Sequence, residues 1–92
     1  MFGQINKITS LADKRDLLVE LVRTDANTMP GCRSYMVALD STDDTVIWVT
    51  EVWDNAEMQK ASMSIPSVKA SVEKAMPMIA GFETVATIIP IA

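Results

Sequence analysis

Histidine is absent from the 92-residue sequence, and cysteine occurs once, as Cys32. A chain with no imidazole and a single thiol cannot by itself assemble the common zinc sites, a Cys-His pair or a Ser-His-Asp triad. A lone cysteine also cannot form a disulfide within its own chain, so cysteine usage gives no sign of an oxidising compartment. We therefore expect no metal centre and no catalysis through histidine.

Basic charge and long apolar segments are also scarce. The sequence has 8 Lys and Arg residues against 12 Asp and Glu residues, giving a net charge of −4, whereas nucleic-acid-binding proteins normally present a basic face. No apolar run approaches the roughly 20 residues of a membrane-spanning helix, and the first residues lack the pattern of a signal peptide. These absences predict a cytoplasmic protein that binds neither nucleic acid nor membranes.

The apolar content is high enough for a folded core, since 49% of the residues are hydrophobic. No linker-like tract divides the sequence, so we expect a single domain over residues 1–92. A domain of this length buries only about 60–65% of its unfolded surface. Contact with a second subunit would therefore add substantially to its buried area.

Four segments have the alternation and the β-branched residues that are typical of strands. They are residues 2–8, 33–40, 45–54 and 82–89. The third, TVIWVTEVWD, is apolar on both faces apart from Thr50 and Glu51, which is typical of a central strand.

The segments between the strands predict helices. Ser10 is a favourable N-cap for an amphipathic helix of about four turns, whose apolar stripe ends at Asp25. Asn55, or Asp54 before it, can cap a short second helix, and Pro66 suits the first turn of another helix, over residues 67–79.

The resulting order is β-α-β-β-α-β, which predicts an α+β, ferredoxin-like fold: a four-stranded antiparallel sheet with its helices on one face. The other face would be bare, yet apolar residues occur on both sides of the predicted strands. We therefore expect the bare face to pack against a second copy of the chain around a two-fold axis.

Four residues are candidates for a site. Glu51 and Trp53 share a strand face by period two; a Glu buried there would have a raised pKa and could exchange protons, although a salt bridge at the rim is the alternative. The Asn6 amide could hold a ligand oxygen or could lie exposed at a strand edge. Tyr35, the one phenol in the sequence, could bond a ligand carbonyl or could simply pack.

Methionine is plentiful, with 7 residues, four of them near the later helices. These are Met58, Met63, Met76 and Met78. Flexible, polarizable side chains suit the wall of an adaptable pocket for an aromatic guest, and they equally suit the filling of a small core.

The sequence resembles the antibiotic biosynthesis monooxygenase domain family over nearly its whole length. The resemblance rests on the length, on the order of the elements, on Met29-Pro30-Gly31-Cys32 before the second strand and on Glu51-Val52-Trp53-Asp54-Asn55-Ala56. It implies a homodimer whose sheets pack face to face as a dimeric α+β barrel, with a pocket between sheet and helices in each subunit. It also implies cofactor-independent chemistry, in which a deprotonated substrate itself reacts with dioxygen.

Individual residues carry over from the family pattern as follows. Asn6 matches an Asn of the first strand that many oxygen-activating members use, and Trp53 matches the Trp of their E-x-W motif, so both are expected to be catalytic. The family's usual histidines fall at Ser62 and Ser67, and no haem-ligating histidine exists, so the resemblance does not extend to haem degradation.

These observations predict a cofactor-independent monooxygenase acting on a small phenol, quinol or polyketide-like aromatic. Its substrate-binding residues would be Tyr35, Glu51, Ser62 and Met58. The alternative is a non-catalytic dimer of the same fold that binds a small apolar molecule.

Overall fold

The computed structural model describes residues 1–24 and 28–91. Within them, four strands form one antiparallel sheet in the order β2-β3-β1-β4. The strands are β1 (Phe2–Ser10), β2 (Cys32–Leu39), β3 (Val46–Trp53) and β4 (Ile79–Ile88). The helices are α1 (Arg15–Arg23), α2 (Ala56–Ser62), α3 (Pro66–Ala75) and the 3₁₀ turn η1 (Met76–Met78). The predicted α+β, ferredoxin-like order is confirmed.

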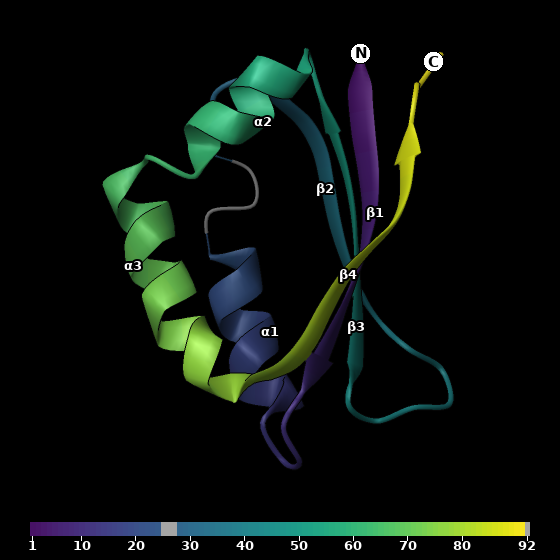
Figure 1. The fold of residues 1–92 in the computed structure, drawn as a ribbon, viewed down its shortest axis with the longest axis vertical. Coiled ribbons are helices and arrows are strands. Elements are labelled where there is room, and N and C mark those ends of the chain that lie inside the picture. The colour runs from purple at the N-terminus through teal and green to yellow at the C-terminus, as the bar shows by residue number, and fades with distance from the viewer. Residues whose placement is uncertain (25–27, 92) are drawn as a thin grey trace.

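All three α-helices lie on the same face of the sheet, as Figure 1 shows with the sheet nearly edge-on. The core forms between this covered face and α1 and α3. Its buried apolar residues are Ile8, Leu18, Ile47, Val49 and Ala75. Within the described part of the chain, no helix is both long enough and apolar enough to cross a membrane.

The first helix begins later than predicted, at Arg15 rather than after Ser10. Ser10 stays in the sheet because its backbone N–H donates to the Thr45 carbonyl (2.8 Å) and it lies opposite Ile79 in the β1–β4 ladder. The chain then turns through Asp13, whose φ of 62° is left-handed. Asp25, the predicted end of the apolar stripe, lies outside the described residues.

The boundaries on either side of Pro77 also differ from the prediction. The third helix stops at Ala75 instead of residue 79, because proline cannot donate the hydrogen bond that an α-helix interior needs, and Pro77 lies in η1 instead. Strand β4 starts at Ile79 instead of residue 82, since Ile79 is already opposite Ser10. The Asn55 cap is confirmed: its side-chain oxygen accepts the Met58 N–H at 2.8 Å.

The open face of the sheet carries the alternate residues of the same strands. No described helix covers it (Figure 1). Its apolar side chains, placed by the strand registers, are Ile5, Met36, Ala38, Val46, Trp48, Val52, Ala86 and Ile88.

Candidate functional site

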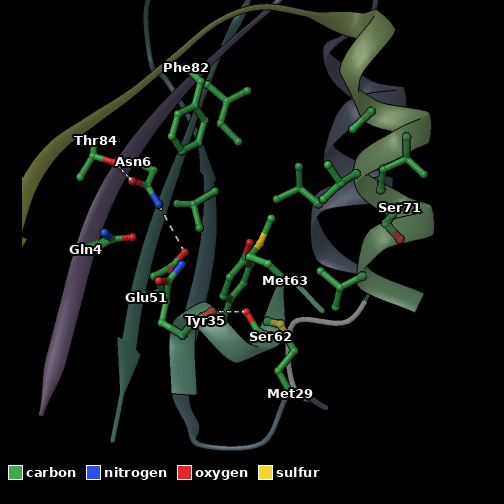
Figure 2. A pocket seen from close by; sticks show the side chains of 18 of the residues that line it. Gln4, Asn6, Met29, Tyr35, Glu51, Ser62, Met63, Ser71, Phe82 and Thr84 are labelled. Atoms are coloured by element: carbon green, nitrogen blue, oxygen red, sulfur yellow. Dashed lines mark hydrogen bonds between the residues drawn. The ribbon is translucent and has the colours of Figure 1, made fainter. Parts of the chain in front are cut away.

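A cavity of about 560 Å³ lies between the covered face of the sheet and the helices. The sheet contributes its polar wall, which includes Asn6, Glu51 and Thr84 (Figure 2). The helical side is mostly apolar, with residues such as Val68 and Val72 from α3. The volume is in the usual range for small-molecule sites, which is about 300–1,000 Å³. The pocket is therefore large enough for a ligand with one or two rings.

The mouth of the pocket reaches the molecular surface. Met63, Met76 and Phe82 all line the pocket, and between 48% and 62% of each residue is exposed. Because these three residues border the cavity and are also exposed to solvent, a ligand can enter beside them without unfolding the core.

A chain of hydrogen bonds crosses the polar wall. The Thr84 hydroxyl donates to Asn6 Oδ1 (2.8 Å), and Asn6 Nδ2 donates to Glu51 Oε2 (3.3 Å; Figure 2). On the other side, the Trp53 indole N–H donates to Glu51 Oε1 (3.0 Å). Asn6, Glu51 and Trp53 are all buried. Both oxygens of a buried carboxyl group thus receive a hydrogen bond, which matches the acceptor-only character of the ionised form.

The strand registers explain why these side chains meet. Gln4 lies opposite Glu51 and Asn6 lies opposite Val49, so Asn6 and Glu51 are diagonal neighbours on one face. The β1–β4 ladder shifts register between Ile5 and Asn6, which sets Thr84 opposite Asn6. The bulge therefore turns Thr84 toward the amide.

Burial raises the pKa of Glu51 and that of its neighbour Tyr35. Removal from water raises the pKa of Glu51, and the hydrogen bonds from Trp53 and Asn6 only partly oppose this effect. Tyr35 lies opposite Glu51 in the β2–β3 ladder. Its burial, and then the negative charge of Glu51, raise the pKa of Tyr35 well above its usual value. The Tyr35 hydroxyl therefore keeps its proton and remains a hydrogen-bond donor at neutral pH.

The structure brings five of the six predicted site residues to the pocket. They are Asn6, Tyr35, Glu51, Trp53 and Ser62. Ser62 is buried and its hydroxyl donates to the Gln59 carbonyl (2.6 Å), which leaves its oxygen as an acceptor. Met58 is not part of the pocket wall: it packs over Gly31, where an added Cβ would approach the Met58 side chain to 2.8 Å.

Sequence reasoning missed Thr84, which no motif identifies. The periodicity of the last strand alone does not reveal which of its residues faces Asn6, because the bulge changes the alternation. Of the methionines near the later helices, Met63 and Met76 line the pocket together with Met29 from the turn before β2. Among the described residues, no group of three or more Cys, Asp and Glu side chains is placed to hold a metal ion.

Solved structures of distant sequence share this fold. A candidate antibiotic biosynthesis monooxygenase from Nitrosomonas europaea is 14% identical and superposes with a TM-score of 0.87, with all of both chains covered. A protein from Mycobacterium tuberculosis is 16% identical, with a TM-score of 0.81 over 99% of this chain and 95% of the other. Among curated proteins, none matches the sequence significantly.

A nearer relative and a family profile give the assignment. A candidate antibiotic biosynthesis monooxygenase from Chloroflexus aurantiacus is 40% identical, with a TM-score of 0.94 over 99% of this chain and 93% of the other. The sequence profile described as antibiotic biosynthesis monooxygenase matches residues 1–74. Because this match spans both the polar wall of β1 and β3 and most of the helical layer, the chain belongs to the antibiotic biosynthesis monooxygenase family.

Proposed function

We propose that the protein is a cofactor-independent monooxygenase that oxidises a small phenol, quinol or polyketide-like aromatic. The observation that carries the proposal is the hydrogen-bonded Glu51 carboxyl in the polar wall of a mostly apolar pocket. A buried carboxylate with a raised pKa is a suitable proton acceptor for a weakly acidic hydroxyl. An apolar pocket provides the site for an aromatic ring.

The reaction would begin when Glu51 takes the proton of the substrate hydroxyl. The electron-rich ring carbon of the resulting anion forms a bond with dioxygen, and the product of this addition is a hydroperoxide once a proton returns. Loss of the C–H proton and cleavage of the O–O bond then release water and leave a quinone. A phenol and one O₂ thus give one quinone and one water, with dioxygen as the oxidant.

The remaining residues would orient the substrate and Glu51. The Asn6 amide has two N–H groups, and its bond to Glu51 uses one of them, so the other is available to a substrate or peroxide oxygen. Tyr35, which lies opposite Glu51 in the β2–β3 ladder and also lines the pocket, would donate a further hydrogen bond to the substrate. Trp53 forms part of the wall and fixes the position of the Glu51 carboxyl through its indole N–H.

Oxygen uptake by the purified protein with a panel of quinols and phenols tests the proposal. Uptake above the buffer rate is expected, and Asn6→Ala and Glu51→Gln should each lower it about 10²-fold or more. Thr87→Val, an exposed position of β4, is the control and should leave the rate unchanged. Uptake equal to buffer across the panel would overturn the proposal, and an unaffected Asn6→Ala rate would remove the role of Asn6.

A non-catalytic binding protein is the second candidate. Ser62 occupies the position where the family's helix usually has a histidine, and a serine cannot replace the imidazole in proton transfer. The Ser62 hydroxyl, moreover, already donates its hydrogen to the Gln59 carbonyl. Methionines at the mouth suit the capture of an apolar molecule. Binding of an aromatic ligand without oxygen uptake would favour this function.

We also propose that the open face of the sheet packs against a second copy of the chain. Its apolar side chains and the small size of the domain support this arrangement. Thr50→Lys, in the middle of this face, should leave the monomer fold intact and shift the sedimentation of the protein from dimer to monomer. Ala70→Lys, on the exposed part of α3, is the matched control and should sediment as the wild type does. A monomeric wild-type protein would contradict the proposal.

A further inference from the structure

The pocket has an unbalanced charge. Among the described residues that line it, Glu51 is the one carboxyl group and none is Lys or Arg. Tyr35 is the other ionisable group, and its raised pKa keeps it uncharged. The site therefore contains one group that can carry a negative charge and no positive partner for it inside the cavity.

The cations of the chain are engaged elsewhere or lie on other surfaces. Arg33 pairs with Asp54, Arg23 pairs with Glu20, and Lys7 lies over the ring of Trp48 on the open face at 5.9 Å from its centroid. The lysines of α2 and α3 are exposed and do not line the cavity. A ligand anion in the pocket would therefore meet no neutralising charge.

We propose that this pocket selects uncharged aromatic ligands that donate a hydrogen bond and rejects carboxylates and phosphates of the same shape, with Glu51 as the selecting residue. The proposal rests on the proposed function in one respect only, that the substrate binds in this cavity. It adds a restriction on that substrate, namely that the aromatic molecule carries no carboxylate or phosphate group.

An anionic ligand would bring a second negative charge close to the buried Glu51 carboxylate. Glu51 is 5% exposed, so water screens its charge poorly, and the two donors it has, from Trp53 and Asn6, do not cancel it. A second negative charge placed beside it would lose its own hydration and gain repulsion. A neutral hydroxyl instead donates to a free lone pair of the carboxylate, and charge-assisted hydrogen bonds of this kind are strong.

The donors of the wall complete the recognition of such a hydroxyl. The second N–H of Asn6 and the Tyr35 hydroxyl can both donate to its oxygen, while Glu51 accepts its proton. A phenolic hydroxyl both donates and accepts, so it satisfies all three groups, whereas a carboxylate can only accept.

Three naphthalene probes of similar size separate charge from shape: 2-naphthol, 2-naphthamide and 2-naphthoate. At pH 7 the phenol and the amide are neutral and the acid is ionised. Their dissociation constants are measured by titration calorimetry on the intact protein under nitrogen, so that no oxidation takes place. We expect naphthol and naphthamide to bind at least about tenfold more tightly than naphthoate.

The variant Glu51→Gln removes the charge and should bring naphthoate to within about threefold of naphthamide. Glu57→Gln, on the exposed surface of α2 outside the pocket, is the matched control and should keep the wild-type ratio. Circular dichroism checks that each variant is folded, and the naphthamide–naphthoate ratio of the wild type remains a test if Glu51→Gln does not fold.

Equal binding of naphthoate and naphthamide to the wild type, tighter binding of naphthoate, or binding of none of the three probes would overturn this inference. So would an unchanged ratio in folded Glu51→Gln. Because the binding measurement needs no oxygen chemistry, preserved selectivity without oxygen uptake would overturn the oxygenase function and leave the charge selection standing.

Discussion

The sheet carries two pairs in which a tryptophan indole donates to a carboxylate, one on each face. On the open face, Trp48 donates to Asp40 at 2.8 Å, and on the covered face Trp53 donates to Glu51 at 3.0 Å. The two bonds are alike in chemistry and length, yet the pKa values of the two acids are shifted in opposite directions. Hydrogen bonds from Trp48 and from the backbone of the loop lower the pKa of Asp40, whereas burial raises the pKa of Glu51.

The comparison shows that burial, and not the indole donor, decides the chemistry of each acid. Asp40 is reached by water and receives further bonds from the Thr42 and Asp43 N–H groups, which fix the β2–β3 loop. Glu51 lies under the helices and has only side-chain donors. Glu51 therefore does not hold the backbone in place as Asp40 does. The presence of such a buried acid is better explained by ligand binding than by a contribution to stability.

The largest expected effect comes from breaking the helical cover that makes the two faces different. Leu18 of α1 is fully buried, so Leu18→Ala should lower the free energy of unfolding by about 2–5 kcal/mol. Its neighbour Leu17 is 54% exposed, so Leu17→Ala should cost about 0.5 kcal/mol or less. Urea unfolding followed by tryptophan fluorescence measures both, and equal losses would show that α1 does not pack as described.

Removing each acid in turn should give pH dependences of opposite sign. Because the pKa of Glu51 is higher in the folded state than its ordinary value of 4.5, ionisation opposes folding, so the stability of the wild type relative to Glu51→Gln should fall as pH rises above 4.5. The pKa of Asp40 is lower when folded than its ordinary value of 3.8. The stability of the wild type relative to Asp40→Asn should therefore be greatest above pH 3.8 and decrease progressively as the pH falls below it.

Urea unfolding of the wild type and both variants between pH 3 and pH 7 measures these differences. Taking each variant against the wild type at the same pH cancels the contribution of every other carboxyl group. If the stability difference between wild type and variant changed with pH in the same direction for both variants, burial would not be what distinguishes Glu51 from Asp40.

The smallest expected effect comes from the end of the hydrogen-bond chain. Thr84→Val keeps the shape of the side chain and removes the hydroxyl that holds Asn6 Oδ1, so it should cost about 1 kcal/mol of stability. Without that bond the amide can rotate, and we expect a severalfold weaker affinity for 2-naphthol. Thr87→Val, on the same strand but outside the pocket wall, is the control. Identical affinities in both variants would show that Thr84 does not orient Asn6.

Sequence reasoning predicted the order of the elements and the face shared by Glu51 and Trp53, because both follow from local periodicity. It failed at Ser10, where a good capping residue is held in the strand by a hydrogen bond to the Thr45 carbonyl and by pairing with β4. Tertiary pairing outweighed the local preference for a cap. The start of β4 was wrong for the same reason.

The site was predicted in part. Asn6, Tyr35 and Ser62 were identified, and they do line the cavity, but from a resemblance or from their rarity and not from geometry. Thr84 was not identified, because a bulge in a ladder between the first and last strands leaves no pattern within either strand. The position of Met58 over Gly31 was equally hidden, since it depends on the path of the turn.

The hydrogen-bond chain joins residues that are far apart in the order of synthesis. Asn6 and Glu51 are separated by 45 positions, and Thr84 follows Asn6 by 78. During translation the acid and the amide are made well before the strand that completes their wall, and β4 can dock only after it leaves the ribosome. A nascent chain that lacks β4 has neither Thr84 nor Phe82, so the pocket wall is complete only after β4 has been synthesised and has joined the sheet.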